Sequence, residues 1–120
     1  KVSGPFHTSL MAPAGEALQE RFRETSFGEM EIPVFFNCKG GPMEPGETIP
    51  ELLVRQVQSS VYLEDTIRAM AAQGVDTIVE IGPGKALPAF VKKTEKGIRT
   101  YAVETAEEVE QLCVALKGAE

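Results

Sequence analysis

Strand-like runs alternate with helix-like stretches along this chain, and that alternation limits the fold more than any other feature. Apolar runs predict buried strands at 32–37, 77–81 and 98–103. Apolar residues three or four positions apart predict helices over 9–24, from Thr48 through Gln56, over 63–71, over 85–95 and from Thr105 onward. Such alternation predicts an α/β fold of βαβ units with a mostly parallel sheet. Three or four strands are few for a sheet that needs cover on both faces, so we expect part of a larger α/β domain.

The ends of these elements carry their own signals. Thr48 to Glu51 and Thr105 to Glu108 both match a capping box, in which two residues of a helix start satisfy each other's backbone N–H groups. Gly74 is expected just after the end of a helix. Adjacent Gly and Pro residues predict a loop over 38–47, and residues 1–6 read as the end of a strand that runs into a turn.

The charge and cysteine content exclude several classes of function. Twelve Lys and Arg against 18 Asp and Glu give a net charge of −6, which disfavours nucleic acid and anionic membranes as partners. The sequence shows no apolar run of membrane-spanning length and no secretory signal. Cys38 and Cys113 are predicted to be free thiols in a reducing cytosol, and with a single histidine we expect no metal site. The start at Lys1 is expected to reflect processing or truncation.

His7 is the first candidate for chemistry. It follows the predicted strand end, where α/β proteins bind ligands, and a histidine there can act as a general base. A solvent-facing or helix-capping histidine is the alternative. No serine of the chain lies in a G-x-S-x-G nucleophile elbow. The chain is therefore predicted to hold a base without its nucleophile.

The turn at Gly82, Pro83 and Gly84 is the second candidate. A glycine-rich turn between a strand and a helix can present backbone N–H groups to a phosphate. Here the spacing matches neither a Walker loop nor G-x-G-x-x-G. The other interpretation is structural, in which Gly84 permits close strand–helix packing and Pro83 fixes the turn. Arg55 and Gln56 read locally as a solvated pair.

Four segments in order resemble the malonyl-CoA:acyl-carrier-protein transacylases: VSGPFHTSLMAPA at 2–14, LVRQ at 53–56 with Ser59 after it, MAAQGV at 70–75 and EIGPGK at 80–85. The resemblance covers residues 1 to about 95. It implies the C-terminal half of an α/β-hydrolase-like acyltransferase domain. Residues 1–7 would end a small ferredoxin-like subdomain, and residues 8–120 would belong to the large subdomain. The N-terminal half, with the nucleophile and the oxyanion hole, would lie upstream.

The resemblance also implies an activity and its residues. A serine of the missing half would accept a malonyl group from malonyl-CoA and pass it to acyl carrier protein in cytoplasmic fatty acid biosynthesis. His7 matches the histidine base of that family, and Gln56 matches the residue whose backbone carbonyl orients it. Because that contact comes from the backbone, replacing Gln56 is expected to cost less than replacing His7. Phe6 matches a position linked to choice of the acyl group. No cofactor is implied beyond the substrates malonyl-CoA and the phosphopantetheine of the carrier protein.

Three other interpretations stay open at this point. The chain could be part of a polyketide synthase acyltransferase domain. It could be a non-catalytic α/β module that binds coenzyme A or phosphopantetheine at the turn formed by 82–85. It could also be a fragment without independent function.

Overall fold

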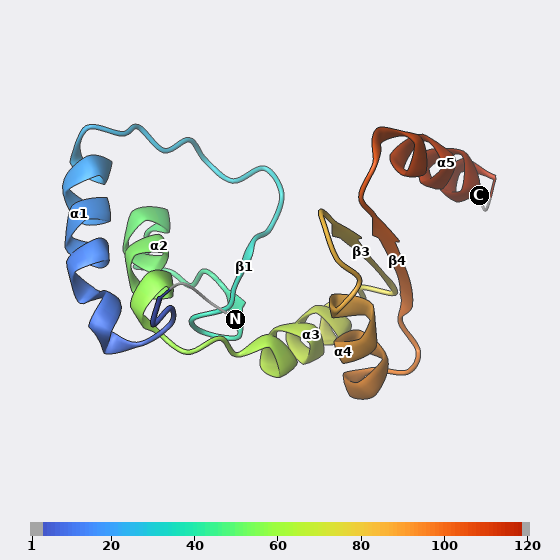
Figure 1. Cartoon of the computed structure of the whole chain (residues 1–120), viewed down its shortest axis with the longest axis horizontal. Coiled ribbons are helices and arrows are strands. Elements are labelled where there is room, and N and C mark those ends of the chain that lie inside the picture. Colours follow the sequence, from blue (N-terminus) through green and yellow to red (C-terminus); the bar gives the residue numbers. More distant parts are fainter. Residues whose placement is uncertain (1–3, 119–120) are drawn as a thin grey trace. The chain divides into compact units, whose positions relative to one another are not determined.

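The computed structural model describes residues 4–118, and the chain divides into two compact units, residues 1–70 and 71–120. The first unit holds a 3₁₀ turn at Ser9–Met11, followed by α1 (Ala12–Arg23), β1 (Phe35–Phe36), β2 (Gly41–Pro42), α2 (Ile49–Gln58) and most of α3 (Leu63–Ala72) (Figure 1). The second unit holds β3 (Thr77–Ile81), α4 (Leu87–Thr94), β4 (Arg99–Val103) and α5 (Ala106–Lys117). All of the predicted helices are confirmed, with ends shifted by a few residues.

In the first unit, α1 and α2 lie side by side (Figure 1). Pro13 falls in the first turn of α1, where its missing N–H breaks no helical hydrogen bond. Gly15 is buried on α1, and a Cβ atom there would lie 2.8 Å from the amide nitrogen of Gln58 on α2. The contact with Val54 on α2 would be an ordinary 3.6 Å, so a methyl group at position 15 would require only the flexible end of Gln58 to shift.

The strand predicted over 32–37 is mostly wrong. Only Phe35 and Phe36 form a strand, and they pair antiparallel with Gly41 and Pro42 instead of joining a parallel sheet. Ile32 is 78% exposed, and Pro33 has no N–H to donate to a neighbouring strand. The chain then reverses through Gly40, whose φ of 70° suits glycine. An apolar run favours a strand locally. In this hairpin, however, the partner strand is only two residues long, so most of the run has nothing to pair with.

A small core joins this hairpin to α2. Phe36, Cys38 and Leu52 are buried together, with Met43 and Leu53 packed against them. The predicted capping box at the start of α2 is confirmed, because Thr48 and Glu51 satisfy each other's backbone N–H groups. The backbone N–H of Tyr62, just before α3, donates to the carbonyl of Asn37 at 2.8 Å. The hairpin is thus fixed to the helices on both sides of it.

The second unit contains the βαβ arrangement that the sequence predicts. β3 and β4 pair in parallel, from Thr77 opposite Arg99 to Ile81 opposite Val103. Helix α4 connects them and contacts both strands. The capping box at Thr105 and Glu108 opens α5 as predicted. Gly74 has a φ of 87° just beyond α3, which agrees with its predicted place after the helix end.

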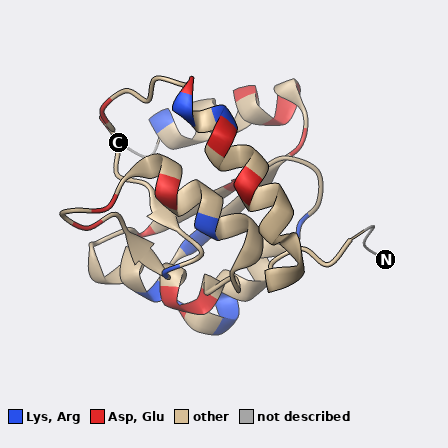
Figure 2. Ribbon diagram, turned by 90° about the vertical axis from the view of Figure 1, so that its left-hand side faces the viewer, with Lys and Arg blue, Asp and Glu red and all other residues tan. Residues whose placement is uncertain are grey.

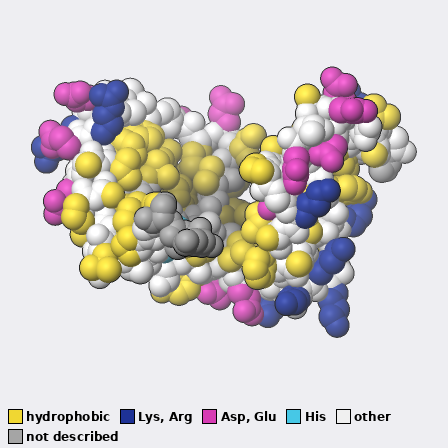
Figure 3. All heavy atoms as spheres, in the orientation of Figure 1, with side chains coloured by type: hydrophobic (Ala, Val, Ile, Leu, Met, Phe, Trp, Pro, Cys, Tyr) yellow, Lys and Arg dark blue, Asp and Glu magenta, His cyan; other side chains and the backbone are white. Residues whose placement is uncertain are grey.

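Each unit leaves large apolar side chains in solvent. Leu10 is 73% exposed in the first unit, while Ile81 and Val114 are 79% and 73% exposed in the second. Hydrophobic side chains gather on the visible face of the first unit near α1 and α2 (Figure 3). Within the described part of the chain, no helix has the length and apolar character needed to cross a membrane.

Two smaller predictions concern the cysteines and the N-terminus. Cys38 is buried and Cys113 is exposed, and both are free thiols as expected. The predicted strand end falls mainly on residues 1–3, which lie outside the described residues. Phe6 and His7 form a turn, in agreement with the sequence.

Candidate active site

His7 is held at the C-terminal end of α2 by two hydrogen bonds. Its backbone N–H donates to the carbonyl of Val57 at 3.2 Å, and its Nδ1 lies 3.1 Å from the carbonyl oxygen of Gln56. Both acceptors belong to the last turn of the helix, whose carbonyls have no partner within the helix. The structure therefore brings two predicted site residues, His7 and Gln56, into direct contact.

The contact with Gln56 fixes which ring nitrogen of His7 carries the proton. A carbonyl oxygen can only accept, so Nδ1 must donate and the neutral ring carries its lone pair on Nε2. The partner of Nδ1 is thus a neutral backbone group and not a carboxylate. Among residues 4–118, the hydrogen bonds of His7 go to Gln56 and Val57, and none goes to a serine. The imidazole is exposed, with Nε2 as its basic atom.

The backbone of His7 adopts an unusual conformation. Its φ is 61°, and His7 is the only described residue other than glycine with a positive φ. This left-handed region is unfavourable for a residue with a Cβ atom and is found at functional sites more often than elsewhere. The two hydrogen bonds to the end of α2 compensate for part of that cost. Phe6, the predicted acyl-selecting residue, directly precedes His7 in the chain and is 51% exposed.

The side chain of Gln56 makes a contact that the sequence did not predict. Its Oε1 accepts a hydrogen bond from the backbone N–H of Cys38 at 2.7 Å, and Gln56 is half-buried. Locally, Arg55 and Gln56 read as a solvated pair, which holds for Arg55 alone. The two bonded residues are 18 positions apart, and no local pattern signals a contact of that kind.

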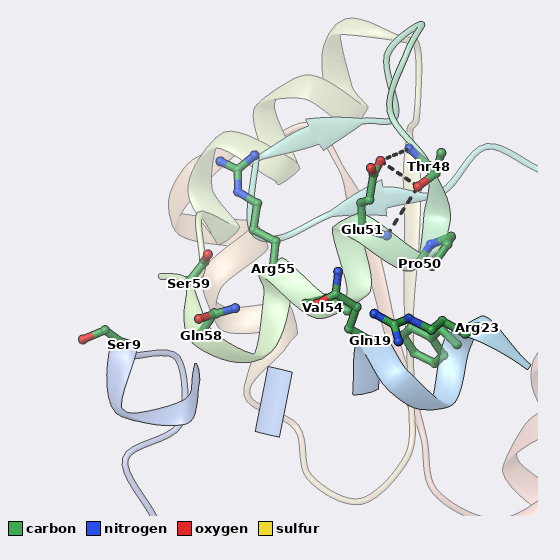
Figure 4. A pocket seen from close by; sticks show the side chains of 11 residues that line it. Ser9, Gln19, Arg23, Thr48, Pro50, Glu51, Val54, Arg55, Gln58 and Ser59 are labelled. Atoms are coloured by element: carbon green, nitrogen blue, oxygen red, sulfur yellow. Dashed lines mark hydrogen bonds between the residues drawn. The ribbon is translucent and has the colours of Figure 1, made fainter. Parts of the chain in front are cut away.

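A cleft of about 670 Å³ lies between α1 and α2 (Figure 4). Ser9, two residues after His7, lines it together with Gln58 and Ser59 at the end of α2. Phe22 and Val54 give the cleft apolar walls, and the capping box of α2 borders it as well. Figure 2 shows positions of both acidic and basic residues along the helices on the side of the chain that it presents.

An ion-pair cluster closes the hairpin beside α2. The ammonium group of Lys39 contacts the carboxylates of Glu44 and Glu47. The hydrogen bond with Glu47 raises the pKa of Lys39, while that bond and the N–H of Glu44 lower the pKa of Glu47. The Lys39 side chain is only 12% exposed, so the cluster is part of the folded hairpin and not a loose surface contact.

The predicted turn at Gly82, Pro83 and Gly84 belongs to the second unit. Its N–H groups are already occupied, since Gly84 donates to the carboxylate of Glu104 at 2.8 Å. The first residue of α4, Leu87, donates to the carboxylate of Glu80 at 3.3 Å. A phosphate would have to displace these carboxylates, which disfavours the phosphate-binding interpretation.

The structural interpretation of the same turn needs one correction. A Cβ atom at Gly84 would meet no atom within 4 Å, so close packing does not explain the glycine. The φ values of Gly82 and Gly84 are 134° and 109°, a range that L side chains rarely adopt. Backbone conformation, and not space, accounts for both glycines.

Relatives with this sequence pattern are found among curated proteins. The malonyl CoA-acyl carrier protein transacylase of Bacillus subtilis is 39% identical over 117 residues, which are 98% of this chain. The Staphylococcus aureus protein of the same name is 32% identical over 108 residues, 90% of this chain. The chain is homologous to a segment of the malonyl CoA-acyl carrier protein transacylases. It spans 37% and 35% of the length of these two transacylases. A scan against protein-family models gave no match.

Solved structures of transacylases share the fold. The malonyl CoA-acyl carrier protein transacylase of Clostridium perfringens superposes with a TM-score of 0.88 at 38% identity, over 98% of this chain and 37% of that one. A malonyl-transacylase in complex with its type II PKS acyl-carrier protein gives a TM-score of 0.79 at 33% identity, over 90% of this chain and 35% of that one. The α/β fold class inferred from the sequence is thereby confirmed.

Proposed function

We propose that this chain supplies the general base of a malonyltransferase that moves a malonyl group from malonyl-CoA to acyl carrier protein. The observation that carries the proposal is the 3.1 Å contact between Nδ1 of His7 and the carbonyl oxygen of Gln56. It leaves Nε2 of the neutral imidazole as the basic atom. Homology to the transacylases supports the reaction class. This chain spans only 37% of the length of the Bacillus subtilis relative, so we assign the nucleophile to the part of the enzyme outside this chain.

In the proposed reaction, Nε2 of His7 takes the proton of a serine hydroxyl while that oxygen attacks the malonyl thioester carbonyl. The C–S bond then breaks, and the protonated imidazole returns its proton to the departing coenzyme A thiolate. The product of this half is a malonyl-serine ester. In the second half, His7 takes the proton of the phosphopantetheine thiol while its sulfur attacks the ester carbonyl. The ester C–O bond then breaks, and the protonated imidazole returns its proton to the serine oxygen. The Gln56 carbonyl accepts from Nδ1 in both the neutral and the protonated ring, so Nε2 is the atom that takes up and releases the proton.

The finer assignments follow from the same proposal. Phe6 would narrow the space for the acyl group beside His7 and so favour malonyl over branched groups. Fatty acid biosynthesis in the cytoplasm is the proposed setting, because malonyl transfer to a carrier protein starts the condensation chemistry. The structure with a type II PKS acyl-carrier protein makes polyketide synthesis the second setting to test.

The test compares His7→Ala with the parent sequence in the complete enzyme, by which we mean this chain joined to a segment that supplies the relatives' remaining length. Intact mass spectrometry after incubation with malonyl-CoA follows formation of the malonyl-enzyme, and transfer to carrier protein gives kcat/KM. Loss of a general base is expected to lower kcat/KM on the order of 10²-fold or more.

Glu16→Ala, on the exposed side of α1, is the matched control and should leave transfer unchanged. Near-normal transfer by His7→Ala would contradict the role proposed for His7. A complete enzyme that never gains a malonyl group would contradict the proposed reaction itself.

A further inference from the structure

We propose that the side chain of Gln56 is a positioning element for His7, acting through its hydrogen bond to the backbone N–H of Cys38. This inference rests on the proposed function of His7 and adds a role for the side chain to that of the backbone carbonyl. Gln56 is bonded at both ends: its carbonyl oxygen lies 3.1 Å from Nδ1 of His7, and its Oε1 accepts from Cys38 at 2.7 Å. One residue thus links the imidazole to the hairpin.

The hairpin end of this link is rigid. Cys38 is fully buried, and its thiol lies 3.6 Å from the carbonyl oxygen of Leu52 on α2. The N–H groups of Lys39 and Gly40 both donate to the carbonyl of Phe36 at 3.0 Å, which closes the turn around Cys38. The N–H of Cys38 is therefore held at a fixed place, and a buried donor that loses its partner is strongly unfavourable.

The helix end of the link needs such support. α2 ends at Gln58, and Ser59 is already extended, so the carbonyls that hold His7 belong to a terminal turn. Terminal turns fray because their carbonyls lack partners within the helix. The bond from Gln56 to Cys38 ties this turn to the buried hairpin. It thereby fixes the direction of the Gln56 carbonyl and, through it, the tautomer and orientation of His7.

Gln56→Met removes the acceptor while keeping the length of the side chain, and Gln56→Asn keeps an amide but shortens its reach. Gln56→Glu keeps an oxygen acceptor at the same distance and is the rescue variant. Thr66→Val is the matched control, because it removes a hydroxyl that lies 3.5 Å from Oδ1 of Asn37 in the same hairpin without touching Gln56. All three Gln56 variants retain the backbone carbonyl.

The readout is the tautomer of His7, measured by NMR of the chain labelled with nitrogen-15 histidine. The chain contains a single histidine, so one ring gives the whole signal. The parent sequence and Gln56→Glu should show the proton on Nδ1, and so should Thr66→Val. Gln56→Met and Gln56→Asn should lose this Nδ1–H signature. In the complete enzyme these two should also lower kcat/KM on the order of tenfold to a hundredfold, as expected when a catalytic group is misplaced.

An unchanged tautomer in both Gln56→Met and Gln56→Asn would overturn the proposal, and so would an equal loss of the signature in Thr66→Val. A parent chain with the proton on Nε2 would overturn it as well. The NMR result does not depend on acyl transfer. An active His7→Ala enzyme with the expected tautomer shifts would therefore refute the proposed function and leave the positioning contact established.

Discussion

Gly40 is the position where the structure predicts the sharpest loss of stability from one added methyl group. In Gly40→Ala the new Cβ atom would lie 2.6 Å from the Cβ of Asp65 and 3.3 Å from the Cβ of Tyr62. Neither atom is the free end of a flexible side chain, so the hairpin itself would have to move away from the start of α3. The φ of 70° adds a conformational cost, because alanine avoids that region.

The two costs can be estimated separately. Placing a non-glycine residue in the left-handed region costs about 1–2 kcal/mol, and forcing an extra methyl group into filled space costs about 1–3 kcal/mol more. Gly40→Ala should therefore lower the free energy of unfolding by about 2–5 kcal/mol. Gly46 is the matched control, since its φ is 89° but an added Cβ meets no atom within 4 Å. Gly46→Ala should lose only the conformational part, about 1–2 kcal/mol.

The assay is urea-induced unfolding of the parent sequence and the two variants, followed by far-ultraviolet circular dichroism at one pH. A larger loss in Gly40→Ala than in Gly46→Ala measures the steric part directly. Equal losses in the two variants would refute the reasoning, because Asp65 and Tyr62 would then leave room for the methyl group. An unchanged stability of Gly46→Ala would refute the conformational part.

Two further predictions concern the helix start of α5 and the ion-pair cluster. Thr105→Ala should lower the free energy of unfolding by about 1 kcal/mol while Thr105→Ser should not, since only the hydroxyl caps the N–H of Glu108; equal urea midpoints would contradict the cap. The pKa of Glu47 is lowered by Lys39, so its stabilisation is present above about pH 4.3 and is lost as the pH falls through the lowered pKa. The midpoint temperature of thermal unfolding should therefore fall more steeply between pH 7 and pH 3 for the parent sequence than for Glu47→Gln. Parallel plots of midpoint temperature against pH would contradict this.

Local patterns predicted the elements whose causes are local. The capping boxes at Thr48 and Thr105 and the glycine after α3 are set by residues a few positions apart, and each was found where expected. The parallel pair of β3 and β4 follows from the strand–helix–strand order, because a helix between two strands brings them together in parallel. The strand predicted over 32–37 is mostly wrong because its pairing partner is the two-residue strand β2 of the same hairpin, and not a longer strand elsewhere in a sheet.

The contacts of the candidate site also differ in how far the sequence predicted them. His7 and Gln56 are 49 positions apart, and the resemblance to the transacylases, not their spacing, predicted that they meet. The hydrogen bond between Gln56 and Cys38 joins a side chain to a backbone N–H. Any residue other than proline provides such an N–H, so the sequence around position 38 does not predict this bond. The roles proposed for His7 and Phe6 stay predictions.

The left-handed backbone of His7 has a consequence for how this protein can be altered. Glycine adopts a φ of 61° without penalty, and asparagine tolerates it better than histidine does. A library screened for thermal resistance alone would therefore enrich glycine or asparagine at position 7, and each enriched clone would lack the imidazole. On the function proposed for His7, selection for resistance to heat and selection for turnover would act in opposite directions at this residue.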